Sequence, residues 1–513
     1  MDGRHRTGAL GGRRWATLVI VFLLAIAGME SVAVASTGRS IRLRFFDRRG
    51  RELSALEARS RMTDGGAGWA NDALVDPIHL FDLEAHPLYV DGTGHLAFDL
   101  PERPVALAVN WPTSRGYSML ILDDGGAGFT TGGVVDFTYR AALDAMRTLD
   151  EELAARPTYV RSAAFLDAYA ASANDLDAAN ASADPSVRGR YGALALDELA
   201  TANDLLLAGY GTQVAGGSPS IEPWLGVTID TTAAYRSHLT LARDLTDPFG
   251  WVRIVMDPGT PFSDYEPVVR RAHVEGLKVM GQPIDSSYAA GFPGRSYLAR
   301  IRRAVRALPA VDAWEIGNEV NGSWLGPNMA DRLDLAATWL HVHHPAKTVV
   351  LTLYWQIGTD APRWSTFNWI RDELKPSTIS DTDVFLLSTW IEDAPMGLAF
   401  DRVLRALQDA LPAHEVGIGE LGYWGQGTSK AWWYGDRRDT TAARRSVLDQ
   451  LYRASLGYRW SVGGVFWWYF GEEMPADAAL AAELAAIRDD IVSGTAPRSI
   501  YPPNTAASAA TTT

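Results

Sequence analysis

Between residues 221 and 492 the sequence alternates eight times between a short apolar run and an amphipathic helical pattern. Strands that alternate with helices form a parallel sheet, because each helix carries the chain back over one face of the sheet. Eight such units in about 270 residues fit a closed (β/α)8 TIM barrel, whose usual size is about 250 residues. An open doubly wound sheet shares the alternation, but the glycine-rich turn that it often carries is missing after Ile229. We therefore predict the barrel, with strands at 224–229, 251–257, 277–282, 312–318, 347–354, 383–389, 415–420 and 463–469.

The chain before the barrel has two different patterns. Residues 36–135 hold short apolar runs between Gly, Asp and Pro turns, which predicts a small β-rich, sandwich-like domain. Residues 136–215 are alanine-rich with helical spacing of apolar positions, which predicts a helical connector to the α/β barrel at 221–492. Residues 493–513 lack any apolar period, and we expect a disordered tail there.

The first 35 residues have the pattern of an export signal. Basic residues precede an apolar run at 16–27, and Ala33-Val34-Ala35 offers a small-x-small cleavage site. The run is shorter than the roughly 20 residues that a membrane span needs. We expect residues 1–35 to be a cleaved signal peptide, and the mature protein to be secreted, without a stable membrane span. An uncleaved N-terminal anchor, as in a membrane-anchored envelope protein, is the alternative.

Charge and composition exclude several classes of function. Lys and Arg number 47 against 61 acidic residues, a formal charge of −14, which disfavours binding to nucleic acid. The absence of cysteine excludes disulfides, thiolate zinc sites and cysteine nucleophiles. His341, His343 and His344 lie at the end of a predicted helix, where histidine complements the helix dipole. We expect neither a metal nor a cofactor.

Two predicted strands end in a carboxylate. The fourth runs from Trp314 through Asn318 to Glu319, and the seventh ends at Glu420. Reacting groups of such barrels lie at the C-terminal ends of the strands. Two carboxylates across a barrel mouth can cleave a glycosidic bond, because one protonates the leaving oxygen while the other attacks or stabilises the anomeric carbon. Either Glu alone is equally compatible with a helix cap or a rim ion pair, but the two strand positions together favour the catalytic interpretation.

With these motifs the sequence resembles the (β/α)8 retaining glycoside hydrolases of the large clan that contains β-glucosidases, cellulases, mannanases and xylosidases. The resemblance rests on Trp314-Glu315-Ile316-Gly317-Asn318-Glu319 and on Glu420, and it covers residues 221–492. It implies a glycosidase with Glu319 as general acid/base, Glu420 as nucleophile and Asn318 bonded to the sugar 2-hydroxyl. The implied substrate is an oligo- or polysaccharide. A catalytically silent barrel that binds glycan is the alternative.

The two glutamates need different environments. Glu420 must be ionised to attack, whereas Glu319 must hold a proton near neutral pH. Burial and a negative neighbour raise the pKa of a carboxyl, and a nearby cation lowers it. We expect Arg253 to be that cation for Glu420, as an arginine near this place is in the clan; a rim ion pair with Asp257 is the alternative. We interpret Glu315, deeper on the strand of Glu319, as a paired structural carboxylate.

Tryptophan is concentrated in the barrel region, which holds 15 of the 18 residues of this type. Indole faces stack on sugar rings, so a Trp at the end of strand eight is expected to form the floor of the substrate site. Alternation turns only one of Trp467 and Trp468 inward, and we expect Trp467. Trp390 and Trp424 follow strand ends and are candidates for further sugar contacts, with core or rim packing as the alternative.

The chain departs from many clan members at two places. Val320 follows Asn-Glu where many members have Pro. Ser388-Thr389-Trp390 stands at the end of strand six, where many place a Tyr to hold the nucleophile. Tyr354 on strand five is our candidate substitute for that Tyr.

Overall fold

The computed structural model describes residues 39–62, 72–217, 222–391, 393–423 and 440–494. The expected signal peptide at 1–35 and the candidate Trp424 lie outside these residues, as does the expected tail from residue 495 onward. No helix within the described ranges is long and apolar enough to cross a membrane.

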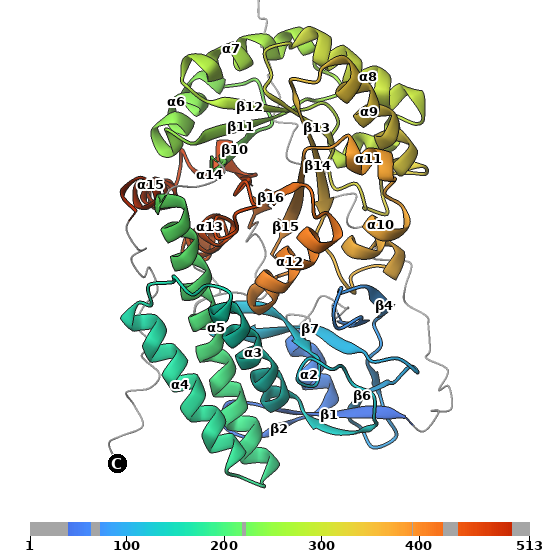
Figure 1. Cartoon of the computed structure of the whole chain (residues 1–513), viewed down its shortest axis with the longest axis vertical. Helices are drawn as coiled ribbons and strands as arrows, with labels where there is room; N and C mark the ends of the chain where they lie inside the picture. The colour runs from blue at the N-terminus through green and yellow to red at the C-terminus, as the bar shows by residue number, and fades with distance from the viewer. Residues whose placement is uncertain (1–38, 63–71, 218–221, 392, 424–439, 495–513) are drawn as a thin grey trace, which may run out of the picture.

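Eight parallel strands close into a barrel, which confirms the predicted (β/α)8 fold (Figure 1). The first strand pairs with both the second and the eighth, so the sheet has no open edge. The strands in order are β10 (Leu225–Ile229), β11 (Gly250–Val255), β12 (Lys278–Gln282), β13 (Ala313–Gly317), β14 (Thr348–Tyr354), β15 (Val384–Trp390), β16 (Glu415–Gly422) and β17 (Val465–Trp467).

Helices cover the outside of the barrel and pack their apolar faces against the strands. They are α6 (Tyr235–Thr246), α7 (Glu266–Val274), α8 (Arg295–Ala307), α9 (Met329–His343), α10 (Thr366–Asp372), α11 (Pro376–Ser380), α12 (Phe400–Ala410), α13 (Thr440–Ser455), α14 (Phe470–Glu473) and α15 (Ala478–Ser493). Four short 3-10 helices lie in the connections: η1 (Phe262–Tyr265), η2 (Ser286–Gly291), η3 (Pro362–Trp364) and η4 (Gly397–Ala399).

The barrel interior changes from apolar to charged along the strands. A buried cluster fills the end where the strands begin, and its members are Trp224, Trp251, Met280, Ala313, Val350, Val384, Leu386, Val462 and Phe466. Alternation places Arg253 two residues beyond Trp251, Glu315 two beyond Ala313 and Thr352 two beyond Val350, all facing inward. Charged groups are therefore gathered at the C-terminal mouth above an apolar plug.

Two antiparallel sheets precede the barrel. In the first the strand order is β2 (Glu52–Leu53), β1 (Ser40–Phe46), β6 (Leu96–Asp99) and β5 (Tyr89–Val90), with β9 (Gly133–Asp136) parallel to β1. In the second it is β4 (Asp82–Ala85), β3 (Asp72–Val75), β7 (Ala106–Thr113) and β8 (Gly116–Leu122). Apolar side chains of both sheets and of helix α2 (Ala55–Met62) share one core.

Three helices join this β-rich part to the barrel: α3 (Phe137–Ala154), α4 (Ala163–Asn180) and α5 (Pro185–Gly217). Figure 1 shows α5 running from the β sheets up to the barrel, where it packs on α13 and α15. Gly211 permits this approach, because a Cβ atom there would overlap the backbone carbonyl of Arg453 on α13. The helices therefore connect the two parts through close packing of α5 on α13 and α15.

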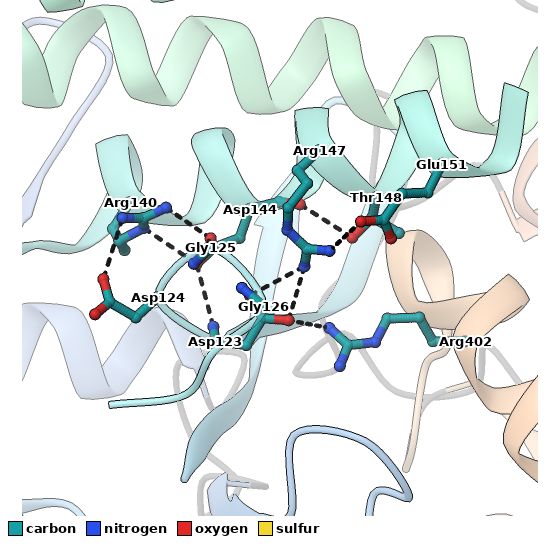
Figure 2. A network of polar contacts seen from close by, with 10 residues as sticks. All are labelled: Asp123, Asp124, Gly125, Gly126, Arg140, Asp144, Arg147, Thr148, Glu151 and Arg402. Carbon is teal, nitrogen blue, oxygen red and sulfur yellow. Dashed lines mark hydrogen bonds and ion pairs between the residues drawn. The ribbon is translucent and has the colours of Figure 1, made fainter. Parts of the chain in front are cut away.

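A buried carboxylate strengthens the same attachment (Figure 2). Asp123, in the loop after β8, accepts hydrogen bonds from Arg147 of α3 and from Arg402 of barrel helix α12, the latter at 2.8 Å. The backbone of the glycine-rich turn beside it also binds carboxylates, since Gly126 N–H donates to Asp123 and Gly125 N–H donates to Asp144 of α3. The loop thus serves as an anchor between the β-rich part, the connector and the barrel.

Candidate active site

Glu420 lies on β16 at the mouth of the barrel and is almost completely buried, with 3% of its surface exposed. Arg253 Nη1 donates to its Oε2 at 2.8 Å, and Asn318 Nδ2 donates to the same oxygen at 3.2 Å. Earlier on the same strand, Gly417 and Gly419 have no side chains, which leaves room for Leu386 of the neighbouring strand β15. The strand thereby holds one carboxylate against a fixed cation.

Glu319 follows β13 by two residues and is also nearly buried, with 7% of its surface exposed. Its backbone φ is 51°, in the left-handed region that non-glycine residues rarely adopt. Such local strain persists only where surrounding contacts fix it, and it is concentrated at functional sites. Here Ser286 Oγ donates to Oε2 at 2.8 Å, Ser388 Oγ donates to Oε1 at 2.7 Å, and Trp390 Nε1 donates to Oε1 at 3.2 Å.

A short hydrogen-bonded chain connects the two carboxyl groups. The backbone N–H of Ser286 donates to Asn318 Oδ1 at 3.0 Å, while its hydroxyl donates to Glu319. Because Asn318 Oδ1 is fixed as an acceptor, its Nδ2 faces Glu420 as a donor. The structure therefore brings Asn318, Glu319 and Glu420 together at one site, as predicted from the sequence.

Arg253 lies inside the barrel rather than on its rim. The residue is fully buried, and its Nε and Nη2 donate to the two carboxylate oxygens of Glu315 at 2.8 and 2.9 Å. Thr352 Oγ1 adds a bond to Glu315 at 2.6 Å. A buried ion pair is tolerated only when its remaining polar atoms are also satisfied, as they are here. Glu315 thus holds Arg253 in place, and Arg253 in turn meets Glu420.

Burial raises the pKa of both candidate catalytic carboxyls. For Glu420 it raises the pKa to about 8; Arg253 opposes the rise, and the charges of Glu319 and Asp285 add to it. For Glu319 burial raises the pKa as expected, with the hydrogen bonds from Ser388 and Ser286 opposing the rise. The expectation that Arg253 keeps the pKa of Glu420 low is wrong, because Arg253 divides its charge between two carboxylates and does not offset complete burial.

No protein-family model matches the chain, and no curated protein sequence does. Among solved structures, the endo-beta-1,4-mannanase from Thermotoga petrophila aligns with a TM-score of 0.39 and 11% identity, over 56% of this chain and 80% of its own. The beta-mannanase from the blue mussel Mytilus edulis aligns with a TM-score of 0.35 and 10% identity, over 52% of this chain and 91% of its own. The FMN-binding beta-glucuronidase from Facaelibacterium prausnitzii L2-6 aligns with a TM-score of 0.32 and 13% identity, over 47% of this chain and 37% of its own. Likeness at this level does not extend to activity, so the function rests on the geometry of the site.

Of the two tryptophans at the end of strand eight, Trp468 lies in the site, which corrects the expectation for Trp467. The alternation on β17 explains the difference, because Phe466 fills the barrel interior and Trp468, two residues later, faces the same way. The ring of Trp468 lies 5.4 Å from the Arg253 guanidinium carbon. Trp467 is fully buried on the outer side, where its Nε1 donates to Glu473 at 2.9 Å.

The remaining aromatic candidates take different positions. Trp390 is half-buried, bonds Glu319 and lies edge-on to Trp468, with 6.3 Å between ring centroids. Tyr354 ends β14, and its ring lies edge-on to Trp324 at 5.5 Å. Tyr354 was the candidate to hold Glu420, and the hydrogen bonds to Glu420 seen in the structure come from Arg253 and Asn318.

Ser286 was not predicted from the sequence as a site residue, and neither was the hydrogen bond from Ser388 to Glu319. Ser388 stands at the position where a nucleophile-holding residue was expected, yet its hydroxyl meets the other glutamate. Ser286 begins η2, directly after Asp285, whose side chain caps that turn. An Asp-Ser-Ser turn after a barrel strand is the only sequence signal for it, and this signal is also typical of ordinary capping.

No group of three metal-ligating side chains lies close enough to hold an ion in the part of the chain that the structure describes. His343 instead has its Nδ1 at 2.8 Å from the Trp339 carbonyl oxygen, and its ring stacks on the indole of the same residue. The observed site is therefore built from carboxyl, guanidinium, amide, hydroxyl and indole groups.

Proposed function

We propose that the chain is a glycoside hydrolase that cleaves O-glycosidic bonds of an oligo- or polysaccharide with retention of configuration. The observation that carries the proposal is the pair of buried carboxyls at the ends of barrel strands four and seven. Arg253 contacts one of the pair, and neutral donors surround the other. Two carboxyls in different environments are the arrangement that separates a nucleophile from an acid.

In the first step Glu420 attacks the anomeric carbon. Arg253 and Asn318 both donate to Oε2, which leaves Oε1 as the oxygen for attack. Arg253 is a full cation at 2.8 Å, whereas the donors around Glu319 are neutral, so a single proton shared by the pair rests on Glu319. Glu319 gives this proton to the leaving oxygen as the glycosidic bond breaks. A covalent bond forms between the sugar and Glu420.

In the second step water replaces the first product. Glu319, now a carboxylate, takes a proton from the water. At the same time the water oxygen bonds to the anomeric carbon, and the bond between the sugar and Glu420 breaks. Trp468, beside Arg253, offers an indole face to the sugar ring throughout both steps. The double displacement returns the sugar in its original configuration.

The proposal is tested with a panel of aryl glycosides in both anomeric series, together with a Glu319→Gln variant. We expect the wild type to release a sugar whose first-formed anomer, followed by NMR, matches the substrate. Glu319→Gln should lower kcat/KM about 10²- to 10⁴-fold for substrates with poor leaving groups, because it removes the general acid. No turnover by the wild type, or unchanged turnover by the variant, would favour a barrel that binds glycan without cleaving it.

The pH dependence follows from the coupled carboxyls. We expect a bell-shaped profile of kcat/KM, because only the state with one proton on the pair is active. Burial and their mutual charge raise the pKa of both carboxyls, so the pair loses its last proton above the ordinary carboxyl range and the rate falls on the alkaline side. Measurement between pH 4 and 10 is the test, and Glu319→Gln is the matched control. The alkaline limb should disappear in the variant; if it persists, another group supplies the proton.

We also propose that the protein acts outside the cytoplasm after removal of residues 1–35. The support is the basic and apolar pattern of that segment together with its small-x-small site. Expression of the full chain in a host with a secretory system should release mature protein that begins near Ser36 into the medium. Recovery in the membrane fraction with residues 16–27 retained would favour the anchored alternative.

A further inference from the structure

The hydroxyl groups around Glu319 have a property that its indole partner lacks. Oε1 receives hydrogen bonds from Ser388 and Trp390, and Oε2 receives one from Ser286. A serine hydroxyl can both donate and accept a hydrogen bond, whereas the tryptophan N–H can only donate. Ser388 is fully buried and Ser286 nearly so, so bulk water does not readily replace either of them.

A general acid/base must keep its place while its proton leaves and returns. The ionised carboxylate accepts from all three donors, as the structure shows. The protonated carboxyl offers one O–H donor and therefore needs a neighbour that can accept. Oε1 is the poorer place for the proton, because the donor-only N–H of Trp390 already points at it.

We propose that Ser286 and Ser388 are positioning residues that hold Glu319 in both protonation states, and that the oxygen facing Ser286 carries the transferred proton. This inference rests on the proposed glycosidase function and assigns roles within it. In the resting acid, Oε2–H donates to Ser286 Oγ. When Oε2 gives its proton to the leaving oxygen, the Ser286 hydroxyl turns and donates to the new carboxylate. The reverse turn follows when water returns a proton to Oε2.

The backbone around Ser286 does not move in this exchange. Its N–H continues to donate to Asn318 Oδ1, so the amide that contacts Glu420 keeps its orientation. The charged groups near Glu319 are Asp285 on the preceding turn, Glu420 on β16, and Arg253 with its partner Glu315. None of them is a hydroxyl that can switch between donor and acceptor, so the switching is left to the two serines.

The test compares two substrates that differ in their need for an acid. A phenyl glycoside has a poor leaving group that requires protonation, whereas a 2,4-dinitrophenyl glycoside requires little. Ser286→Ala should lower kcat/KM for the phenyl glycoside about 10-fold or more and change that for the dinitrophenyl glycoside less than about 3-fold. Ser388→Ala should show the same selectivity with a smaller loss, because Trp390 still holds Oε1. Ser286→Thr, which keeps the hydroxyl, should restore most of the activity.

Matched controls lie next to each serine. Ser287→Ala removes a hydroxyl that bonds Asp285 instead of Glu319, and Thr389→Val removes a buried hydroxyl without a hydrogen-bond partner. Both should leave the ratio of the two substrates unchanged. Ser286→Ala should also displace the alkaline limb of the phenyl glycoside profile from its wild-type position, because Ser286 contacts the carboxyl that donates the proton.

The outcomes distinguish a failure of the roles assigned to the two serines from a failure of the proposed glycosidase function. Equal losses on both substrates, or no loss on either, would overturn the role of the serines while leaving the glycosidase intact. A larger selective loss in Ser388→Ala than in Ser286→Ala would move the transferred proton to Oε1. No turnover of either substrate by the wild type would overturn the proposed function and, with it, the role of the serines.

Discussion

Replacement of Glu420 by glycine is expected to lower kcat by at least about 10⁴-fold on aryl glycosides, because it removes the group that attacks the anomeric carbon. Azide should then restore turnover of substrates with good leaving groups. It fits the space that the side chain vacates and attacks the same carbon, since Glu319 and Arg253 remain in place. The product should be a glycosyl azide of inverted configuration, which NMR distinguishes from the retained sugar.

The control for this variant lies on the same strand. Glu415 begins β16 at the end remote from the mouth, so Glu415→Gln should leave kcat unchanged. A Glu420→Gly protein that keeps wild-type turnover would remove Glu420 from the mechanism. Rescue that gives an azide of retained configuration would show instead that a second residue forms the covalent intermediate.

Hydrophobic patterning was sufficient to predict the barrel. Each predicted strand coincides with an observed one to within three residues at either end, because parallel strands buried on both faces are continuous apolar runs. Runs such as Val384–Leu387, in which every residue is apolar, leave little ambiguity about where a strand lies. The position of Glu319 and Glu420 at the mouth followed from the same pattern, since strand ends are marked by the first polar residues after the run.

The contacts within the site were harder to predict, because they depend on register and on turns. The choice between Trp467 and Trp468 required knowing that Phe466 faces inward, and a run of six apolar and aromatic residues conceals this parity. Ser286 reaches Glu319 only because η2 folds back over the end of β13. The pKa of Glu420 depended on how completely the residue is buried and on the division of Arg253 between two partners. None of these three properties is local in the sequence.

Arg253→Met is expected to lower the free energy of unfolding by about 3–5 kcal/mol at neutral pH, because it leaves Glu315 and Glu420 buried without a cation. The exposed pair of Arg270 and Glu266 supplies the control, and Arg270→Met should change stability by less than about 0.5 kcal/mol. Urea denaturation of both variants and of the wild type measures the free energies of unfolding. The comparison holds where these free energies depend on urea concentration with the same slope. Near-equal losses would show that Arg253 contributes no more than a surface charge.

The loss caused by Arg253→Met should also depend on pH with a definite sign. Burial raises the pKa of Glu420 above its value in the unfolded chain, and without Arg253 nothing opposes this rise, so the folded variant binds more protons. The variant should therefore regain stability as the pH falls from 8 toward the ordinary carboxyl pKa of about 4.3. The double variant Arg253→Met/Glu315→Gln removes one stranded charge and should lose less than the single variant at neutral pH. If the double variant loses more, the main role of Arg253 is to fill volume in the barrel, and its charge does not account for the stability of the site.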